Sequence, residues 1–169
     1  MDHRETPGGQ IQELTGSFKI RQAGAGEASA LSAVAQRSKA HWGYDAEFMA
    51  DCTDELTWDE TDIASGTFWV AQDEGGARLG FCELCLVHDM VEVEALYVDP
   101  DAMGQGIGHA LWRKAEELAG EHKARAIGLD ADPHAVGFYQ RMGAEVVGKA
   151  PSGSIPGRVL PRMMKELMT

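Results

Sequence analysis

The sequence predicts one layered α/β domain, in which helices flank a mixed central sheet of about six to seven strands. Three observations predict this fold: strand and helix patterns alternate along the chain, a glycine-rich loop joins a strand directly to a helix, and no repeat divides the sequence. A length of 169 residues suits one domain with a proper core. Residues 1–16 are polar and contain Pro7-Gly8-Gly9, so we expect a flexible leader before a domain over 17–169.

Charge and composition narrow the classes of partner. The formal net charge is −12 at pH 7, and no cluster of Lys and Arg offsets it, so a nucleic acid would be repelled. An acidic surface suits a cationic partner better, for example an amine. No apolar run is long enough to cross a bilayer and no secretory signal is visible, so we expect a cytoplasmic protein with no membrane partner.

The three cysteines do not indicate a metal site. Cys82 and Cys85 have the spacing of half a zinc site, but no second pair of cysteines exists. On a strand over 81–87 their side chains would point to opposite faces of the sheet. We therefore expect buried thiols and no metal.

The first half of the chain alternates between strand and helix patterns. Asp45 is a plausible N-cap for a helix, and the acidic residues of 51–62 are interpreted as a solvated face. The patterns predict a strand over 18–21, helices over 27–40 and 46–56, strands over 68–71 and 77–87 around the turn Glu74-Gly75-Gly76, and a strand over 90–98 that Asp99-Pro100 ends.

The second half continues the alternation after the glycine loop. Pro133 is well placed in the first turn of a helix and Gly143 at its end. The predicted elements are a helix over 109–119, a buried strand over 124–130, a helix over 134–142 and strands over 145–149 and 158–167.

The strand over 90–98 contains an irregularity. Val91 and Val93 alternate with Glu92 and Glu94, and then the pair Ala95-Leu96 breaks the alternation, which resumes in the opposite phase. A phase slip of one residue is what a β-bulge produces, and bulges re-aim side chains near active sites. We therefore predict a bulge at Ala95-Leu96.

The loop Met103-Gly104-Gln105-Gly106-Ile107-Gly108 lies between this strand and the next helix. Free backbone amides at a helix N-terminus, together with the helix dipole, favour an anion, so the loop predicts a cradle for a pyrophosphate. The dinucleotide-binding pattern fits badly because the glycines fall as G-x-G-x-G, and the P-loop fits badly because His109-Ala110 follow. A loop that uses glycine only for turning remains the alternative.

Aromatic and titratable residues gather where the first helix ends. His41, Trp42 and Tyr44 surround Gly43, which can stop that helix. This composition is typical of a binding site. Aromatic residues that merely cap the core, with His41 on the surface, are the equally weighted alternative.

The order of elements and two motifs resemble the GNAT family (Gcn5-related N-acetyltransferases). Leu96-Tyr97-Val98-Asp99-Pro100 with the glycine loop is similar to the family's motif A, and Phe138-Tyr139-Gln140-Arg141-Met142-Gly143-Ala144 is similar to its motif B region. The likeness covers roughly 18–167. The chain departs from the family pattern at Met103, where Arg or Gln is usual, and at Asp132, which stands near the usual place of Asn.

The resemblance implies a fold and a co-substrate. It implies the GNAT fold, with a bulged and splayed central strand and a slot for acetyl-CoA between that strand and 127–129. The pantetheine arm would pair with the backbone of 96–98, and the pyrophosphate would lie on the amides of 104–108. The cofactor-binding residues expected are Leu96, Tyr97, Val98, Met103, Gly104, Gln105, Gly106, Ile107, Gly108, Asp132, Phe138 and Tyr139.

The implied reaction is direct transfer of an acetyl group to an amine. A neutral amine must lose a proton, and Glu94 beside the predicted bulge is the first candidate for the base, with Glu92, His41 and His134 as rivals. A backbone N–H near the bulge would stabilise the oxyanion. Tyr139 resembles the family's usual proton donor to the thiolate. The acceptor site is expected to include His41, Trp42, Tyr44, Glu92, Glu94 and the loop 152–158.

Several readings of the function remain open at this level. The leading hypothesis is an N-acetyltransferase acting on a small-molecule amine rather than on a protein, and a homodimer is possible. One alternative is a sensor module that binds acyl-CoA without turnover, although the presence of Tyr139 argues against it. Another is a phosphate-binding domain unrelated to coenzyme A.

Overall fold

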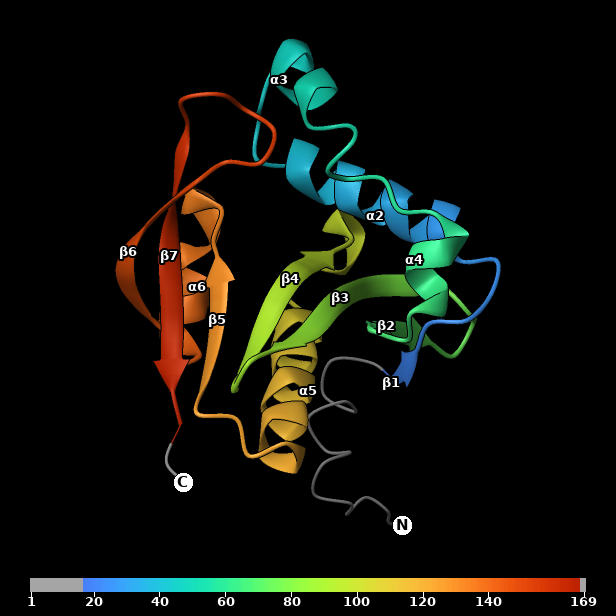
Figure 1. Ribbon diagram of the computed structural model, residues 1–169. Coiled ribbons are helices and arrows are strands. Elements are labelled where there is room, and N and C mark those ends of the chain that lie inside the picture. Colours follow the sequence, from blue (N-terminus) through green and yellow to red (C-terminus); the bar gives the residue numbers. More distant parts are fainter. Residues whose placement is uncertain (1–16, 168–169) are drawn as a thin grey trace.

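A computed structural model describes residues 17–167, and the expected leader over 1–16 lies outside this range (Figure 1). The described chain forms one seven-stranded sheet in the order β1-β2-β3-β4-β5-β7-β6. The strands are β1 (Phe18–Gln22), β2 (Phe68–Asp73), β3 (Arg78–Val87), β4 (Met90–Val98), β5 (Ala126–Asp130), β6 (Glu145–Pro151) and β7 (Val159–Glu166). The helices are α2 (Ala28–Ala40), α3 (Ala46–Asp51), α4 (Glu60–Ala64), α5 (Ile107–Glu121) and α6 (Val136–Arg141), with 3-10 turns η1 (Pro100–Ala102) and η2 (Pro133–Ala135).

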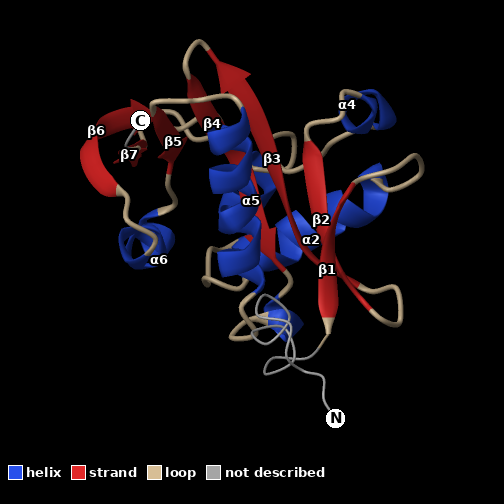
Figure 2. Cartoon of the chain, turned by 90° about the horizontal axis from the view of Figure 1, so that it is seen from below, coloured by secondary structure: helices blue, strands red, loops and turns tan. Residues whose placement is uncertain are grey.

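Helices cover both faces of the sheet, and each face has its own apolar core (Figures 1 and 2). One core joins Leu111 and Trp112 of α5 to Ile127 of β5. The other joins Leu31 of α2 to Phe68 and Phe81 of β2 and β3. These side chains are at most 1% exposed, so the α/β fold predicted from the alternating patterns is confirmed.

Strand β4 contains the predicted bulge, one residue earlier than expected. Glu83 of β3 pairs with Ala95, but the next residue, Leu84, pairs with Val93, so Glu94 is the extra residue. The side chains change sides at this point: Val93 packs into the core under α5, whereas Ala95 packs into the core under α2. A single extra residue therefore inverts the phase of β4, as a bulge does.

The bulge coincides with a separation of two strands. Strands β4 and β5 form the sheet's parallel pair, and their pairing covers only Met90–Glu92 with 126–128. Beyond this point Leu129 and Asp130 pair with β7 alone. The central sheet thus opens into a fork just after Glu92.

Besides shifts of one or two residues at other ends, three helical features differ from the sequence prediction. The helix expected over 46–56 ends at Asp51, where turn bonds such as Thr53 N–H to Ala50 O take over. The acidic stretch interpreted as a solvated face contains the short helix α4, because Asp59 and Asp62 form a reciprocal capping box. The helix expected over 134–142 begins as the 3-10 turn η2, which Asp132 caps.

Replacing Leu111 by Ala tests the core under α5. Leu111 is 0% exposed, so we expect the free energy of unfolding to fall by about 2–5 kcal/mol. Leu86→Ala is the matched control because that side chain is 48% exposed, and its change should stay within about 0.5 kcal/mol. Denaturant unfolding measures both, and equal losses would contradict this packing.

Candidate active site

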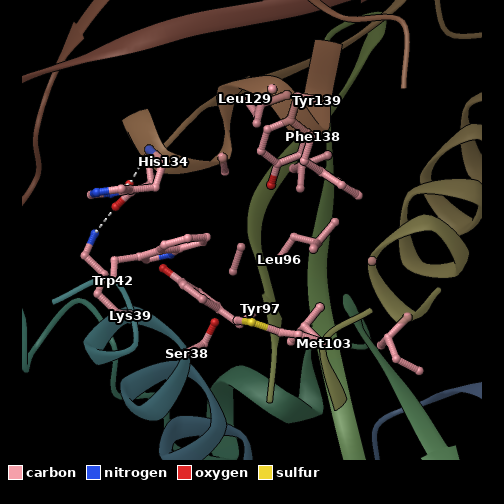
Figure 3. Close-up of a pocket in the computed structure, with 18 of the residues that line it drawn as sticks. Ser38, Lys39, Trp42, Leu96, Tyr97, Met103, Leu129, His134, Phe138 and Tyr139 are labelled. Carbon is pink, nitrogen blue, oxygen red and sulfur yellow. Dashed lines mark hydrogen bonds and ion pairs between the residues drawn. The ribbon is translucent and has the colours of Figure 1, made fainter. Parts of the chain in front are cut away.

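A cavity of about 560 Å³ occupies the fork between β4 and β5 (Figure 3). Its walls come from β4, the glycine loop, the end of β5, the segment from η2 to α6 and the end of α2. Most of the residues predicted for the site line this cavity: Trp42, Glu94, Leu96, Tyr97, Val98, Met103, Gly104, Gly106, Ile107, Gly108, Asp132, Phe138 and Tyr139. Four predicted residues do not line it: His41, Tyr44, Glu92 and Gln105.

The glycine loop presents free amides to one end of the cavity. Gly104 and Gly106 have φ angles of 83° and 84°, which favour glycine. Helix α5 begins at Ile107 without a side-chain cap, so its first amides have no intrahelical partner. A Cβ on Gly104 would meet nothing within 4 Å, whereas one on Gly108 would lie 3.1 Å from the Phe138 ring. The loop therefore fits a pyrophosphate beside it, and Gly108 is needed for packing.

Strand β4 turns an unpaired backbone edge toward the cavity. The amide of Asp99 donates to the carbonyl of Leu79 on β3 at 2.8 Å. Amides of alternate residues point the same way, so Leu96 and Val98 direct their N–H and C=O groups away from β3. Because β5 has already diverged, these groups face the cavity, where an extended amide chain could pair with them.

Two carboxylates on β4 have different surroundings. Glu92 is bound by Arg162 of β7, whose Nη2 donates to Glu92 Oε1 at 2.9 Å. Glu94 is exposed and lines the cavity. Burial raises the pKa of Glu94 above its ordinary value, the charges of Glu92 and Asp130 raise it further, and Arg162 acts in the opposite direction. Of these two carboxylates, Glu94 is the one free to accept a proton.

Tyr139 brings a protonated phenol to the cavity. It is 6% exposed and its ring packs 5.7 Å from Trp112 and 5.0 Å from Phe138. Its hydroxyl points into the cavity (Figure 3). Burial raises the pKa of Tyr139 well above its ordinary value, so the hydroxyl keeps its proton at neutral pH and can donate it.

Asp132 is held by side chains from three segments. Its carboxylate accepts from Tyr44 Oη at 2.9 Å and from the His134 amide at 2.9 Å, and it pairs with Lys39 Nζ at 3.2 Å. Arg158 Nη2 in turn donates to Tyr44 Oη at 2.9 Å. Burial alone would raise the pKa of Asp132, but the His134 amide, Lys39 and Tyr44 outweigh it and lower the pKa. The carboxylate is thus an anion bound within the cavity wall.

The aromatic segment and the β6–β7 loop contact each other beside this end of the cavity. The Arg158–Tyr44 bond joins them, so Tyr44 supports the wall from behind. Trp42 lines the cavity and stacks on His134 with ring centroids 5.0 Å apart. His41 is exposed and contacts the edge of Trp42, while Gln105 lines a separate hollow beside Asp99 and Asp101.

A model of the acetyltransferase (GNAT) family matches residues 37–144, well over half of the chain. This match, together with the cradle and the fork, decides the classification. The chain belongs to the GNAT family of acetyltransferases.

Curated relatives and solved structures agree with this membership. A peptidyl-lysine N-acetyltransferase of Salmonella typhimurium, YjaB, is 34% identical over 88 residues, which are 52% of this chain and 57% of the relative. A putative ribosomal protein bS18-alanine N-acetyltransferase of Bacillus subtilis is 29% identical over 79 residues, 45% of this chain and 52% of the relative. The aligned part is thus a little over half the length of these relatives.

The fold itself matches over nearly the whole chain. The PaiA N-acetyltransferase of Thermoplasma acidophilum, solved in complex with coenzyme A, has a TM-score of 0.75 at 22% identity, covering 89% of this chain and 99% of that one. The splayed seven-stranded sheet is therefore the GNAT fold that the sequence motifs implied.

Several cavity residues of this GNAT domain were not predicted from the sequence. Those with charged side chains are Glu55, Asp130 and Arg141. Asp130 ends a strand that could be predicted, and Arg141 lies one turn after Phe138, so both had a positional signal. Glu55 had none, because its approach depends on the β6–β7 loop, where Ser154 donates a hydrogen bond to it.

The described part of the chain contains neither a metal-binding cluster nor a membrane-spanning helix. Over residues 17–167, no three His, Cys, Asp or Glu side chains are grouped so as to hold a metal ion. Over the same range, no helix has the length and apolar character required to span a membrane.

Replacing Gly104 by Ala tests the cradle. Ala at this positive φ costs about 1–2 kcal/mol of stability, and its methyl group lies in the space where a phosphate would approach. We expect the Kd for acetyl-CoA to rise about tenfold or more, since a hydrogen bond to a charged group contributes about 1.5–3 kcal/mol. Isothermal titration calorimetry measures this change.

Gly76→Ala is the matched control for this variant. Gly76 has a φ of 91°, and a Cβ there also meets nothing within 4 Å, but the residue lies in the β2–β3 turn away from the cavity. It should lose similar stability and keep its affinity. Equal affinities for the two variants would contradict the cradle.

Proposed function

We propose that this protein transfers the acetyl group of acetyl-CoA directly to an amine, and that the acceptor is a small molecule rather than a protein. One observation carries the proposal: the free backbone edge of Leu96 and Val98 connects the anion cradle to Glu94 at the other end of the cavity. A ligand with a pyrophosphate and an amide-containing arm matches this arrangement, because the pyrophosphate suits the cradle and the arm suits the edge. Its thioester would then lie at the bulge.

Glu94 at the bulge and Tyr139 of α6 can supply the two proton transfers. Glu94 accepts the proton of the amine, whose nitrogen attacks the thioester carbonyl carbon. A backbone N–H near Leu96 is suited to stabilise the oxyanion. When the C–S bond breaks, the proton of the Tyr139 hydroxyl passes to the departing thiolate. The cavity therefore suits acetyl-CoA, the co-substrate that membership of the family implies, in its reacting groups as well as in its shape.

The surroundings of Glu94 support a cationic, compact acceptor. Glu55 and Asp130 line the cavity near its acceptor end, and the net charge of the chain is −12. Trp42 and His134 stack across this end, and the Tyr44–Arg158 bond fixes the wall behind them. The carboxylates favour a cationic amine, and the aromatic wall held in place at this end favours a compact one. The curated relatives include enzymes named for peptide and protein acceptors, so these belong in the same test.

An assay of coenzyme A release separates the alternatives. Purified protein, acetyl-CoA and a thiol reagent are combined with diamines, amino acids, aminoglycosides, and peptides with a free lysine or N-terminus. The proposal expects amine-dependent release with a small amine as the best acceptor. A peptide as best acceptor would overturn the small-molecule assignment, and tight acetyl-CoA binding without release for any amine would favour the sensor alternative.

Replacing Glu94 by Gln should lower kcat about 10²-fold or more with the best amine, because general bases contribute roughly 10²–10⁴-fold. The pKa of Glu94 is raised, so the wild-type rate should fall with acidity from a pH above the ordinary carboxyl range, since a protonated Glu94 cannot accept a proton. This limb should disappear in Glu94→Gln. A pH–rate profile unchanged by the substitution would remove Glu94 from the reaction.

Replacing Tyr139 by Phe removes the hydroxyl and keeps the ring that packs on Trp112. We expect about 10²-fold lower kcat with an unchanged Kd for acetyl-CoA. Rates with acetyl thioesters of more acidic thiols show whether protonation is involved, because a better leaving group needs less help. If Tyr139→Phe impairs all thioesters equally, the hydroxyl does not protonate the leaving group.

A further inference from the structure

Arg162 bridges three strands at the point where the sheet forks. It belongs to β7, and its guanidinium reaches across β5 to Glu92 of β4. Both guanidinium nitrogens Nη1 and Nη2 donate to the Glu92 carboxylate, and Nη1 also lies 3.2 Å from Asp130 Oδ1. The last paired residues of β4 and β5 are Glu92 and Gly128. The bridge therefore lies on the last rung before the cavity.

Gly128 provides the space for this bridge. A Cβ at Gly128 would lie 2.5 Å from Arg162 Nη2 and 2.9 Å from the end of Met90, and both distances are too short for real contacts. Any side chain at this position would push the guanidinium off β5. Gly128, in the middle of a buried strand, thus leaves the space that the Arg162 guanidinium occupies. The Arg162 side chain is 25% exposed.

The bridge distinguishes the two glutamates of β4 that the sequence left as rival candidates for the base. Glu92 has its charge compensated and its oxygens bound, with 18% of its side chain exposed. Glu94 is the bulged residue at the cavity, and the structure records no hydrogen bond or ion pair for its side chain within residues 17–167. The charged and titratable groups that act on Glu94 are Glu83 and Cys85 of β3, Glu92 of β4, Asp130 of β5 and Arg162 of β7.

We propose that Arg162 is a positioning residue that holds Glu92 neutralised at the fork and thereby leaves Glu94 as the one β4 carboxylate that receives the proton of the acceptor amine. The role of Glu94 rests on the proposed function, but the positioning by Arg162 is testable without turnover. Among the groups around Glu94, Arg162 is the only cation, and its charge opposes the rise in the pKa of Glu94 that the charges of Glu92 and Asp130 cause.

The test is a titration of Glu94 by NMR, using protein labelled with ¹³C at the glutamate carboxyl carbons and free of acetyl-CoA. Glu94→Gln identifies the resonance. In Arg162→Gln the pKa of Glu94 should rise, because an attractive charge is lost and Glu92 is left uncompensated. In Glu92→Gln it should fall, because a repulsive charge is lost.

The double variant Glu92→Gln/Arg162→Gln removes one charge of each sign, so the pKa of Glu94 should return toward its wild-type value. Arg162→Lys keeps the charge, so the pKa of Glu94 should lie between those of the wild type and Arg162→Gln. Gly128→Ala displaces the guanidinium without changing any charge and should move the pKa in the direction of Arg162→Gln; it also serves if Arg162→Gln does not fold. If Arg162 had only a structural role, its replacement would lower the unfolding midpoint in the single and double variants alike, and the pKa of Glu94 would not follow the charges in this way.

The outcomes separate the two proposals. A Glu94 pKa that is the same in wild type, Arg162→Gln and Gly128→Ala overturns the positioning role, whatever the enzyme does. If the pKa shifts as expected but no amine releases coenzyme A, the proposed function fails while the bridge stands. If both hold, the acid limb of the coenzyme A release rate should move with the titration in every variant.

Discussion

The structure depends on one extra residue in β4. Without the bulge, Glu94 would take a regular paired position, and Ala95 would continue the phase of Val91 and Val93 and face the core under α5. With it, Ala95 turns to the core under α2, and the pairing with β5 ends at Glu92. The same backbone step therefore bends the strand, frees its edge at Leu96 and Val98, and places a carboxylate at the cavity. Position and chemistry of the site have a common origin.

Ion pairs fix the cavity from two sides. At the fork, Arg162 joins β4, β5 and β7 over the side-chain-free position of Gly128. At the acceptor end, Asp132 gathers Lys39 and Tyr44 and so ties α2 to the start of η2. Partly buried charges are retained only when they are paired, since removing one partner leaves an uncompensated charge. In this protein the pairs hold the walls, and they leave Glu94 and Tyr139 at the cavity for the proton transfers that we propose.

The sequence revealed the parts whose cause is local. The phase break after Val93 predicted a bulge, and the glycines around Gln105 predicted the cradle. The exact position of the bulge depends on hydrogen bonds to β3, so the prediction was one residue late. Glu92 stayed a rival of Glu94 because Arg162, the residue that binds it, is 70 positions away in the sequence. A contact of Asp132 with the cofactor stays a prediction, and its side-chain partners, about 90 residues earlier in the segment from Lys39 to Tyr44, could not be predicted from the sequence. Contacts of that range follow from the fold alone.

The most direct test of this account is amide hydrogen exchange of β4, resolved by residue with NMR, with and without acetyl-CoA. If the fork exposes the edge of β4 to the pantetheine arm, the amides of Leu96 and Val98 exchange quickly in the free protein and become protected at saturating acetyl-CoA. The amide of Tyr97, which points toward β3, should be protected in both states and serves as the internal reference. Leu96 and Val98 amides that are protected without ligand, or that stay unprotected with saturating acetyl-CoA, would contradict the account.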